Sequence, residues 1–166
     1  MMKRTHTCAQ LAEKDVGKEA VLCGWVHSRR DHGKLIFIDI RDREGLTQVV
    51  FNPKEAPEAY KKAQDLKPEF VVTLKGAVNL RPEGRQNPRI KTGMVEVLAK
   101  ELLILNESKT PVFEIDDAQA LSEELKLKYR YLDLRRPRSL RNIVMRHKMF
   151  NCVRKLLDSE GFIEVE

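Results

Sequence analysis

Residues 35–41, LIFIDIR, alternate strictly between two kinds of side chain, and this alternation limits the fold more than any other feature of the chain. Successive side chains of an extended strand point to opposite faces. Ile36, Ile38 and Ile40 therefore share one face, which is apolar throughout. The opposite face carries Phe37 among charged side chains. The pattern predicts a strand with one face in a hydrophobic core and an aromatic ring on its outer face.

Five strand-like runs rich in Val, Ile, Leu or Phe precede residue 106, and one short helical segment separates the third run from the fourth. The runs cover residues 19–27, 35–42, 47–52, 70–80 and 94–105. Pro57 suits the first turn of the intervening helix, and Pro68 follows its end. The sequence DREG at 42–45 predicts a hairpin in which Gly45 takes a positive φ. The order β-β-β-α-β-β predicts a mainly β fold, the five-stranded OB-fold barrel, with residues 79–93 as the loop between the last two strands.

A second alternation occurs in the first of these runs. Val21, Cys23 and Trp25 fall on one face of the predicted strand. Because Trp25 alternates with these two apolar residues, we interpret it as a core residue.

The second part of the chain has the pattern of a long amphipathic helix. Residues 139–159 place apolar side chains at three- and four-residue spacings, with Pro137 before them and Gly161 after them. The last residues, FIEVE, predict the start of a strand without the further strands of a sheet, a pattern that indicates a truncated domain. These features predict three segments: a barrel domain over 1–105, an acidic linker over 106–125, and a helical segment over 126–166.

Charge is distributed unevenly over the chain, whose net charge is +6. Residues 126–155 hold eleven basic side chains and one acidic side chain, whereas residues 106–125 hold six acidic and one basic. Basic surfaces favour polyanionic partners such as nucleic acids. The basic block could contact RNA phosphates, or it could pair with an acidic surface of a missing domain or partner. The apolar face of the same helix must bury against something, which favours the second interpretation.

The sequence excludes several kinds of site and location. The phosphate-binding loop, the dinucleotide-binding G-x-G-x-x-G and the zinc motif H-E-x-x-H are absent. The four histidines and three cysteines have no metal-ligand spacing, so no metal site is predicted. No apolar run reaches the ~20 residues that a membrane helix needs, and the N-terminus has no secretory signal. We therefore expect a soluble cytoplasmic protein without a membrane partner.

Phe37 is the candidate centre of a nucleic-acid site on the barrel. Single-stranded nucleic acids bind where bases stack on aromatic rings beside a basic groove. Basic side chains flank the ring in the sequence: Arg29, Arg30, Lys34, Arg41 and Arg43. Gln48 and Glu96 could add hydrogen bonds to base edges, which the loop bases of RNA expose. Alternatively, Phe37 only covers the outer face of the barrel beneath a loop or the helix.

Four stretches closely resemble the N-terminal part of bacterial aspartyl-tRNA synthetases, in the same order along the chain. They are CGWVHSRRDHGKLIFIDIRDREGLTQVVF at 23–51, RPEGRQN…TGMVEVLAKEL within 81–102, LKYRYLDLRRP at 127–137 and GFIEVE at 161–166. Lysyl- and asparaginyl-tRNA synthetases share the same architecture. The resemblance implies an OB-fold that binds the tRNA anticodon, followed by the first helix and strand of a class II α+β catalytic domain, which form a homodimer interface in the intact enzyme.

The same resemblance implies a set of site residues. Phe37 matches the aromatic residue on which an anticodon base stacks, and the other matching anticodon contacts are Arg30, Gln48, Arg81, Asn87 and Glu96. His32 and Gly84 match positions where these residue types accompany relaxed enzymes that charge both aspartate and asparagine tRNAs. The family's residues for ATP, Mg²⁺ and aspartate lie beyond Glu166. We therefore expect no catalytic residue, cofactor or metal site in this chain, although the intact enzyme requires ATP and Mg²⁺.

Three functions remain open at this point. The leading hypothesis is the anticodon-binding part of an aspartate–tRNA ligase, with tRNA rather than DNA as the partner. A second is a free-standing OB-fold RNA-binding paralogue without catalysis. The third, a general single-strand-binding protein, is disfavoured because the best strand has one candidate stacking ring instead of a row of them.

Overall fold

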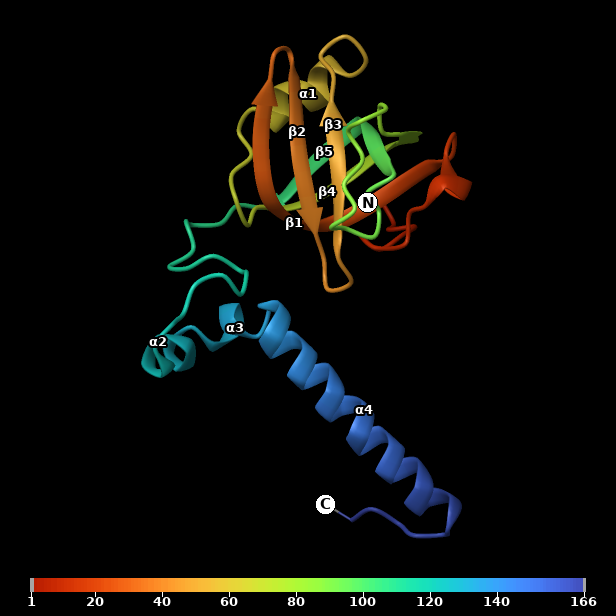
Figure 1. Cartoon of the computed structure of the whole chain (residues 1–166), viewed down its shortest axis with the longest axis vertical. Coiled ribbons are helices and arrows are strands. Elements are labelled where there is room, and N and C mark those ends of the chain that lie inside the picture. The colour runs from red at the N-terminus through yellow and green to blue at the C-terminus, as the bar shows by residue number, and fades with distance from the viewer. Residues whose placement is uncertain (1, 166) are drawn as a thin grey trace. The chain divides into compact units, whose positions relative to one another are not determined.

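The computed structural model describes residues 2–165 and divides the chain into two compact units, residues 1–111 and 112–166. Figure 1 shows the first unit as a barrel of strands and the second as a set of helices. Each unit has its own cluster of buried apolar side chains. Each unit therefore has a hydrophobic core of its own.

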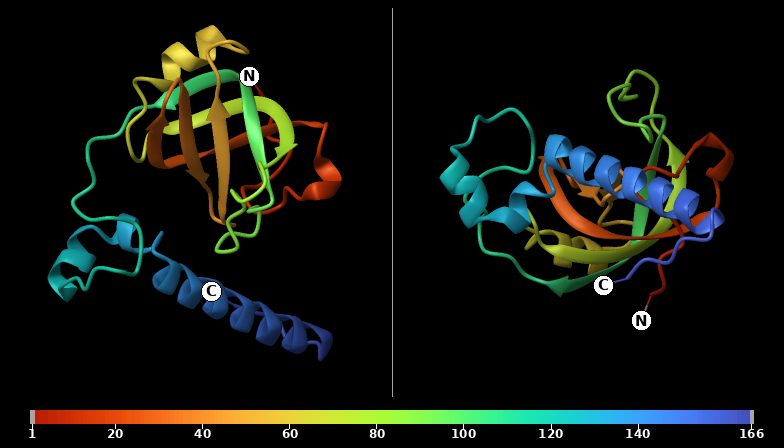
Figure 2. Two further views of the ribbon diagram at one scale, coloured as in Figure 1. Left: turned by 45° about the horizontal axis from the view of Figure 1, so that its top comes forward. Right: turned by 90° about the horizontal axis from the view of Figure 1, so that it is seen from below.

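The described strands of the first unit form a closed barrel. They are β1 Glu19–His32, β2 Leu35–Arg41, β3 Leu46–Phe51, β4 Val71–Leu80 and β5 Val95–Asn106. Their order in the sheet is β1-β2-β3-β5-β4, and only β3 and β5 pair in parallel. A 3-10 turn, Glu13–Asp15, precedes β1, and helix α1, Pro57–Ala63, connects β3 to β4 at one end of the barrel (Figure 2). The predicted OB-fold is confirmed.

The alternation in β2 divides the inside of the barrel from its outside. Ile36, Ile38 and Ile40 are at most 2% exposed and belong to the main core cluster. Phe37, between them, is only half-buried and lies on the outer face. The predicted inner face of β2 is therefore confirmed. Ala59 and Ala63 of α1 pack against the same core, so the short helix closes that end of the barrel.

The interpretation of Trp25 as a core residue is wrong. The inner face of β1 is formed by Leu22 and Val26, both 0% exposed, whereas Trp25 is half-buried on the other face. Gly24 lies between the two inner residues, and a Cβ placed on it would come within 2.4 Å of the Arg41 carbonyl oxygen. Only glycine fits this close approach of β1 to β2. The face with the smaller side chains therefore turns inward.

The predicted hairpin turn at residues 42–45 is present between β2 and β3, but its geometry differs from the prediction. Gly45 does not have a positive φ; instead, Asp42 Oδ1 accepts hydrogen bonds from the backbone N–H groups of Glu44 (2.8 Å) and Gly45 (3.1 Å). The aspartate side chain thus replaces the positive-φ turn. The positive φ, +60°, belongs to Gly33 between β1 and β2. Strand β1 ends directly before this turn, at His32, five residues further along the chain than predicted.

The second unit consists of three helices among its described residues. They are α2 Glu123–Lys128, α3 Arg130–Asp133 and α4 Pro137–Ser159. A small core of Phe113, Ile115 and Leu132 joins the preceding segment to α3. The long predicted helix is present, with Pro137 inside its first turn rather than before it.

The predicted strand at the end of the chain is not formed in its described residues, 162–165. The last turn of α4 closes with a hydrogen bond from Phe162 N–H to the Leu157 carbonyl (3.0 Å), and Gly161 takes a φ of +83°. An extended segment becomes a strand only when another backbone pairs with it. None of the described strands pairs with residues 162–165, so the prediction was wrong for this chain.

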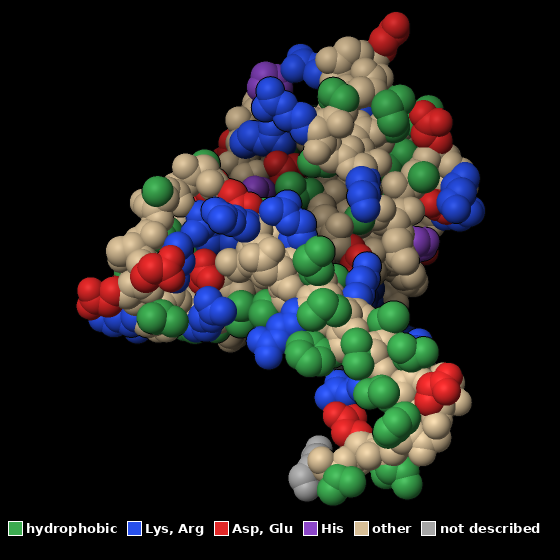
Figure 3. All heavy atoms as spheres, turned by 60° about the horizontal axis from the view of Figure 1, so that its bottom comes forward, with side chains coloured by type: hydrophobic (Ala, Val, Ile, Leu, Met, Phe, Trp, Pro, Cys, Tyr) green, Lys and Arg blue, Asp and Glu red, His purple; other side chains and the backbone are tan. Residues whose placement is uncertain are grey.

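Helix α4 buries none of its side chains within the described chain. Large apolar side chains that are more than two-fifths exposed follow its length: Ile143, Met145, Met149, Phe150, Val153, Leu156 and Leu157. Figure 3 shows hydrophobic side chains gathered over this helix in the lower part of the view. An apolar face of this extent marks a contact surface.

We expect Ile38→Ala to lower the free energy of unfolding of the barrel by about 2–5 kcal/mol, because it leaves a cavity among fully buried side chains. Phe37→Ala removes a larger side chain from the outer face of the same strand and should cost distinctly less. Urea denaturation followed by circular dichroism measures both. Equal losses for the two variants would contradict the assignment of inner and outer faces.

Candidate nucleic-acid interface

One cleft of about 600 Å³ lies on the outer face of the barrel. Strands β1, β2, β3 and β5 contribute to its walls, together with the loop between β4 and β5. All eight site residues implied by the sequence line it: Arg30, His32, Phe37, Gln48, Arg81, Gly84, Asn87 and Glu96. The fold therefore brings residues 30–48 and residues 81–96 together at one place.

Strand register determines how the central residues face one another. Phe37 lies opposite Arg30 of β1 on one side and opposite Val50 of β3 on the other. Gln48 lies opposite Asp39, two residues along β2 from Phe37, and so shares the outer face with the ring. The ring thus has a guanidinium beside it and an amide diagonally across from it.

A chain of hydrogen bonds crosses the floor of the cleft. Arg30 Nη2 donates to Gln48 Oε1 at 3.3 Å, and Gln48 Nε2 donates to Glu96 Oε2 at 2.8 Å. These two contacts fix which end of the Gln48 amide carries the oxygen. Each group keeps further hydrogen-bonding capacity, because an amide offers two donors and a carboxylate accepts several bonds. The floor therefore presents donors and acceptors in a fixed order.

Arg81 supplies an unpaired donor at the wall of the cleft. Its side chain is buried, and its Nε donates to the Val95 carbonyl at 3.0 Å. Its Nη2 is also buried but has no hydrogen-bond partner among the described residues. An unsatisfied buried donor costs roughly 1–3 kcal/mol. A ligand acceptor in the cleft would remove that cost.

Burial changes the protonation behaviour of two of these groups. Burial raises the pKa of the Glu96 carboxyl, and the hydrogen bond from Gln48 and the charge of Arg81 only partly oppose this. Burial also lowers the pKa of the Arg81 guanidinium, against the attraction of Glu96 and Asp39. Arginine nevertheless stays protonated in proteins. Both groups have therefore already lost part of their hydration, and a polar ligand could bind to them without first displacing much water.

The loop over the cleft holds the remaining predicted residues. Asn87 Oδ1 accepts a hydrogen bond from Arg89 N–H at 3.1 Å, and Asn87 N–H donates to the Gly93 carbonyl at 3.0 Å. The side-chain amide nitrogen of Asn87 is left as its free donor. Gly84 has a φ of +74° with open space where a Cβ would lie, and His32 is exposed at the end of β1.

Sequence reasoning missed several residues of the cleft walls. These are Asp31, Leu35, Val50, Pro82, Arg85 and Gln86. Val50 could be found only from the strand register, which places it opposite Phe37. Arg85 and Gln86 belong to the loop that the prolines and glycine already marked, and their polarity was the available signal.

The described residues contain no feature of a metal centre or a membrane anchor. No three His, Cys, Asp or Glu side chains among residues 2–165 are grouped so that they could hold a metal ion. No helix in that range is long and apolar enough to cross a membrane.

The barrel and its cleft define a class of protein. A small closed barrel with an aromatic ring and basic groups on one outer face is the arrangement by which OB-folds bind nucleic acids. Residues 20–105 match the family described as the OB-fold nucleic acid binding domain, and residues 122–166 match the class II tRNA synthetases (D, K and N). The chain belongs to this OB-fold anticodon-binding family and continues into class II synthetase sequence.

Particular relatives narrow this class further. The chain is similar to the aspartate–tRNA(Asp/Asn) ligases of Desulfosudis oleivorans (49% identical over 165 residues) and Nitratidesulfovibrio vulgaris (52% over 164 residues). These matches cover 99% of this chain but only 28% and 27% of the relatives. The asparaginyl-tRNA synthetase of Pyrococcus horikoshii complexed with asparaginyl-adenylate matches all of this chain and 36% of its own, with a TM-score of 0.81 and 28% identity. The resemblance to aspartyl-tRNA synthetases is confirmed.

We expect Glu96→Gln to stabilise the barrel at neutral pH relative to the original chain, because it removes a poorly hydrated charge. A raised carboxyl pKa favours the folded state at low pH, and this contribution is lost as the pH rises through the folded-state pKa. The advantage of the variant should therefore shrink in acid. Thermal unfolding measured from mildly acidic to neutral pH tests this.

Asp15→Asn provides the opposite case. The hydrogen bond from Lys18 holds the pKa of Asp15 below its usual range, so its contribution is present at neutral pH and lost in acid. The variant should be destabilised at neutral pH and approach the original chain in acid. Two variants with the same pH dependence would contradict the assignment of both groups.

Proposed function

We propose that this chain binds the anticodon of tRNA as the N-terminal part of an aspartate–tRNA ligase. The whole enzyme would attach aspartate to tRNA with ATP and Mg²⁺ during cytoplasmic protein synthesis. Because the chain spans 28% of its Desulfosudis relative, amino-acid activation would belong to the rest of that enzyme. We expect this chain alone to be inactive in aminoacylation.

The convergence of all eight candidate residues on one cleft carries this proposal. A base splayed out of an RNA loop could stack on Phe37, while the polar floor accepts and donates hydrogen bonds at the base edges. The unpaired Nη2 of Arg81 would find an acceptor on a base or phosphate. Aromatic stacking and a basic wall together suit a single-stranded RNA loop better than a duplex, whose bases are already stacked.

The choice of tRNA would depend on the rim of the cleft. Relatives of this chain are named as ligases for both the aspartate and the asparagine tRNA. Gly84 leaves open space beside the loop, and His32 offers a polar side chain on the facing strand end. We propose that this pair admits either base at the last anticodon position, so that both tRNAs are bound.

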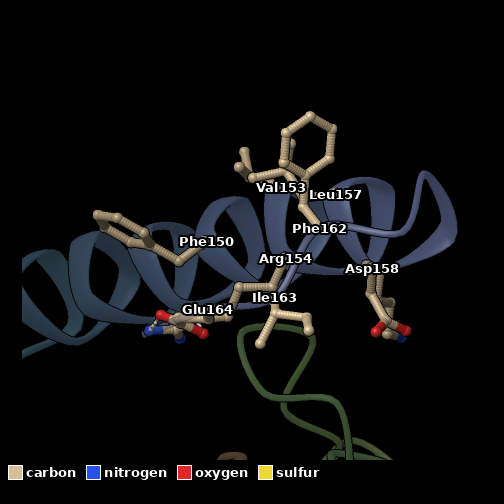
Figure 4. A pocket seen from close by; sticks show the side chains of 9 residues that line it. Phe150, Val153, Arg154, Leu157, Asp158, Phe162, Ile163 and Glu164 are labelled. Carbon is tan, nitrogen blue, oxygen red and sulfur yellow. Dashed lines mark hydrogen bonds and ion pairs between the residues drawn. The ribbon is translucent and has the colours of Figure 1, made fainter. Parts of the chain in front are cut away.

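The apolar face of α4 supports a homodimer of the intact enzyme. Near its end, Phe150, Val153 and Leu157 form a pocket of about 570 Å³ with the following residues, and Figure 4 shows Phe162 close to Val153 and Leu157. The Arg154–Glu164 ion pair (3.0 Å) holds this segment but is exposed, so it contributes little to stability. Burying this face against its copy would remove exposed apolar area from water.

We expect Phe37→Ala to weaken binding of an aspartate anticodon stem-loop by about 1–3 kcal/mol, the usual value of one base–aromatic contact. Phe37→Tyr keeps the ring and should retain most of the affinity. Tyr131→Ala removes an exposed ring of the second unit and serves as the control. Fluorescence anisotropy with labelled stem-loops measures the dissociation constants. Equal binding of the original chain to unrelated hairpins of the same length would refute anticodon recognition.

We expect Leu157→Glu to shift the chain from dimer to monomer, because it places a charge in the apolar face of α4. Lys148→Glu also introduces a carboxylate but lies on the opposite side of the helix, and it should leave the dimer intact. Sedimentation equilibrium gives the mass of each species. A monomeric original chain would remove the support that α4 gives to the homodimer.

A further inference from the structure

A row of polar side chains crosses the outer face of the barrel beside Phe37. Ser28 of β1 lies opposite Asp39 of β2, and Asp39 lies opposite Gln48 of β3. Gln48 in turn donates to Glu96 of β5 at 2.8 Å. Asp39 is the central member of this row, yet it does not belong to the described lining of the cleft.

Asp39 makes contacts that constrain Arg30. Its Oδ2 accepts a hydrogen bond from Ser28 Oγ at 2.7 Å and another from Arg30 Nη2 at 3.1 Å. The same Nη2 lies 3.3 Å from Gln48 Oε1. One nitrogen of the guanidinium is therefore held between a carboxylate and an amide, while Ser28 fixes the carboxylate from the other side.

The two side chains differ in exposure, and this difference determines which of them the contact restrains. The Arg30 side chain is 60% exposed, whereas the Asp39 side chain is 20% exposed. An exposed arginine without a fixed partner samples many rotamers and can bind any nearby phosphate. Held at one nitrogen, Arg30 keeps its remaining N–H donors in a defined direction beside the ring of Phe37.

We infer that Asp39 is a positioning residue that determines base specificity, because it orients Arg30 toward a base edge and withholds it from the RNA backbone. This inference rests on the proposed anticodon binding. Asp39 need not touch the RNA itself. The Ser28 hydroxyl belongs to the same arrangement, since it fixes the carboxylate that holds Arg30.

Electrostatics alone predicts a different result for the removal of Asp39. Deleting an acidic group from a basic surface tightens binding to every RNA backbone by a similar factor, so discrimination between sequences would stay the same. The positioning role predicts instead that discrimination between sequences falls, while binding to an unrelated loop is unchanged or tighter. A merely structural role would weaken both kinds of binding together.

The test compares two hairpins with one stem and different loops, carrying the aspartate anticodon and an unrelated anticodon. For the full chain, discrimination is measured as the dissociation constant for the unrelated loop divided by the dissociation constant for the aspartate loop. We expect Asp39→Asn to lower this ratio by about tenfold, the scale of a hydrogen bond to a charged group. Glu44→Gln removes an equal charge from the exposed β2–β3 turn, where Glu44 pairs with Arg43, and should leave the ratio unchanged.

A double-mutant cycle with Arg30 separates this role from others. If Asp39 acts through Arg30, Arg30→Ala and the Arg30→Ala/Asp39→Asn double variant should have the same ratio. An unchanged ratio in Asp39→Asn, or losses that add in the double variant, would overturn the inference while leaving anticodon binding intact. An original chain that binds both hairpins equally would overturn the proposed function and this inference with it.

Folding is checked by circular dichroism for each variant. Should Asp39→Asn fail to fold, Ser28→Ala removes only the hydroxyl that fixes the carboxylate. We expect a smaller fall of the ratio in the same direction, with tighter or equal binding of the unrelated loop. A Ser28→Ala variant with the original ratio would count against the inference.

Discussion

The barrel depends on the parallel pairing of strands β3 and β5, which closes the sheet. Val49 lies opposite Val97 and Val50 opposite Leu98, although α1 and β4 separate these strands in the sequence. Closure leaves no open sheet edge between these strands and buries Val49 and Val97 completely. The same pairing brings Gln48 to Glu96 on the outer face. The geometry of the cleft therefore follows from the closure of the core behind it.

The hydrophobic core and the proposed binding cleft lie on opposite faces of the same strands. The core cluster inside the barrel gathers more than twenty buried hydrophobic side chains from the strands, from α1 and from the segments beside them. Glu96 on the outer face of β5 and Arg81 after the end of β4 are both partly removed from water by burial. Leaving the Arg81 donor unpaired is tolerated because the core offsets a cost of roughly 1–3 kcal/mol. The outer face can therefore hold an unpaired donor and a partly buried carboxyl group without unfolding of the barrel.

Features that depend on one segment alone could be predicted from the sequence. Features that depend on the packing of one segment against another could not. Ile36, Ile38 and Ile40 revealed the inner face of β2 because their neighbours are polar. Residues 20–26 of β1 are apolar on both faces, so the packing of Gly24 against β2 decided the orientation of Trp25. Eight members of the cleft were predictable from family resemblance, and its other members were not. The register that joins Asp39 to Arg30 was not, because it depends on a bulge near Val26 and on pairing between strands.

The parallel seam between β3 and β5 also has a consequence for the order of folding. The β1–β2–β3 hairpins form between neighbouring segments, so little loop entropy is lost when they pair. The seam joins segments separated by α1 and β4, and such distant pairings form slowly. We therefore expect the ring of Phe37 and the polar side chains of β1 and β2 to reach their places early in folding, and Glu96 to join them when the barrel closes. If the proposed function holds, RNA binding would require the completed barrel and not its first hairpins alone.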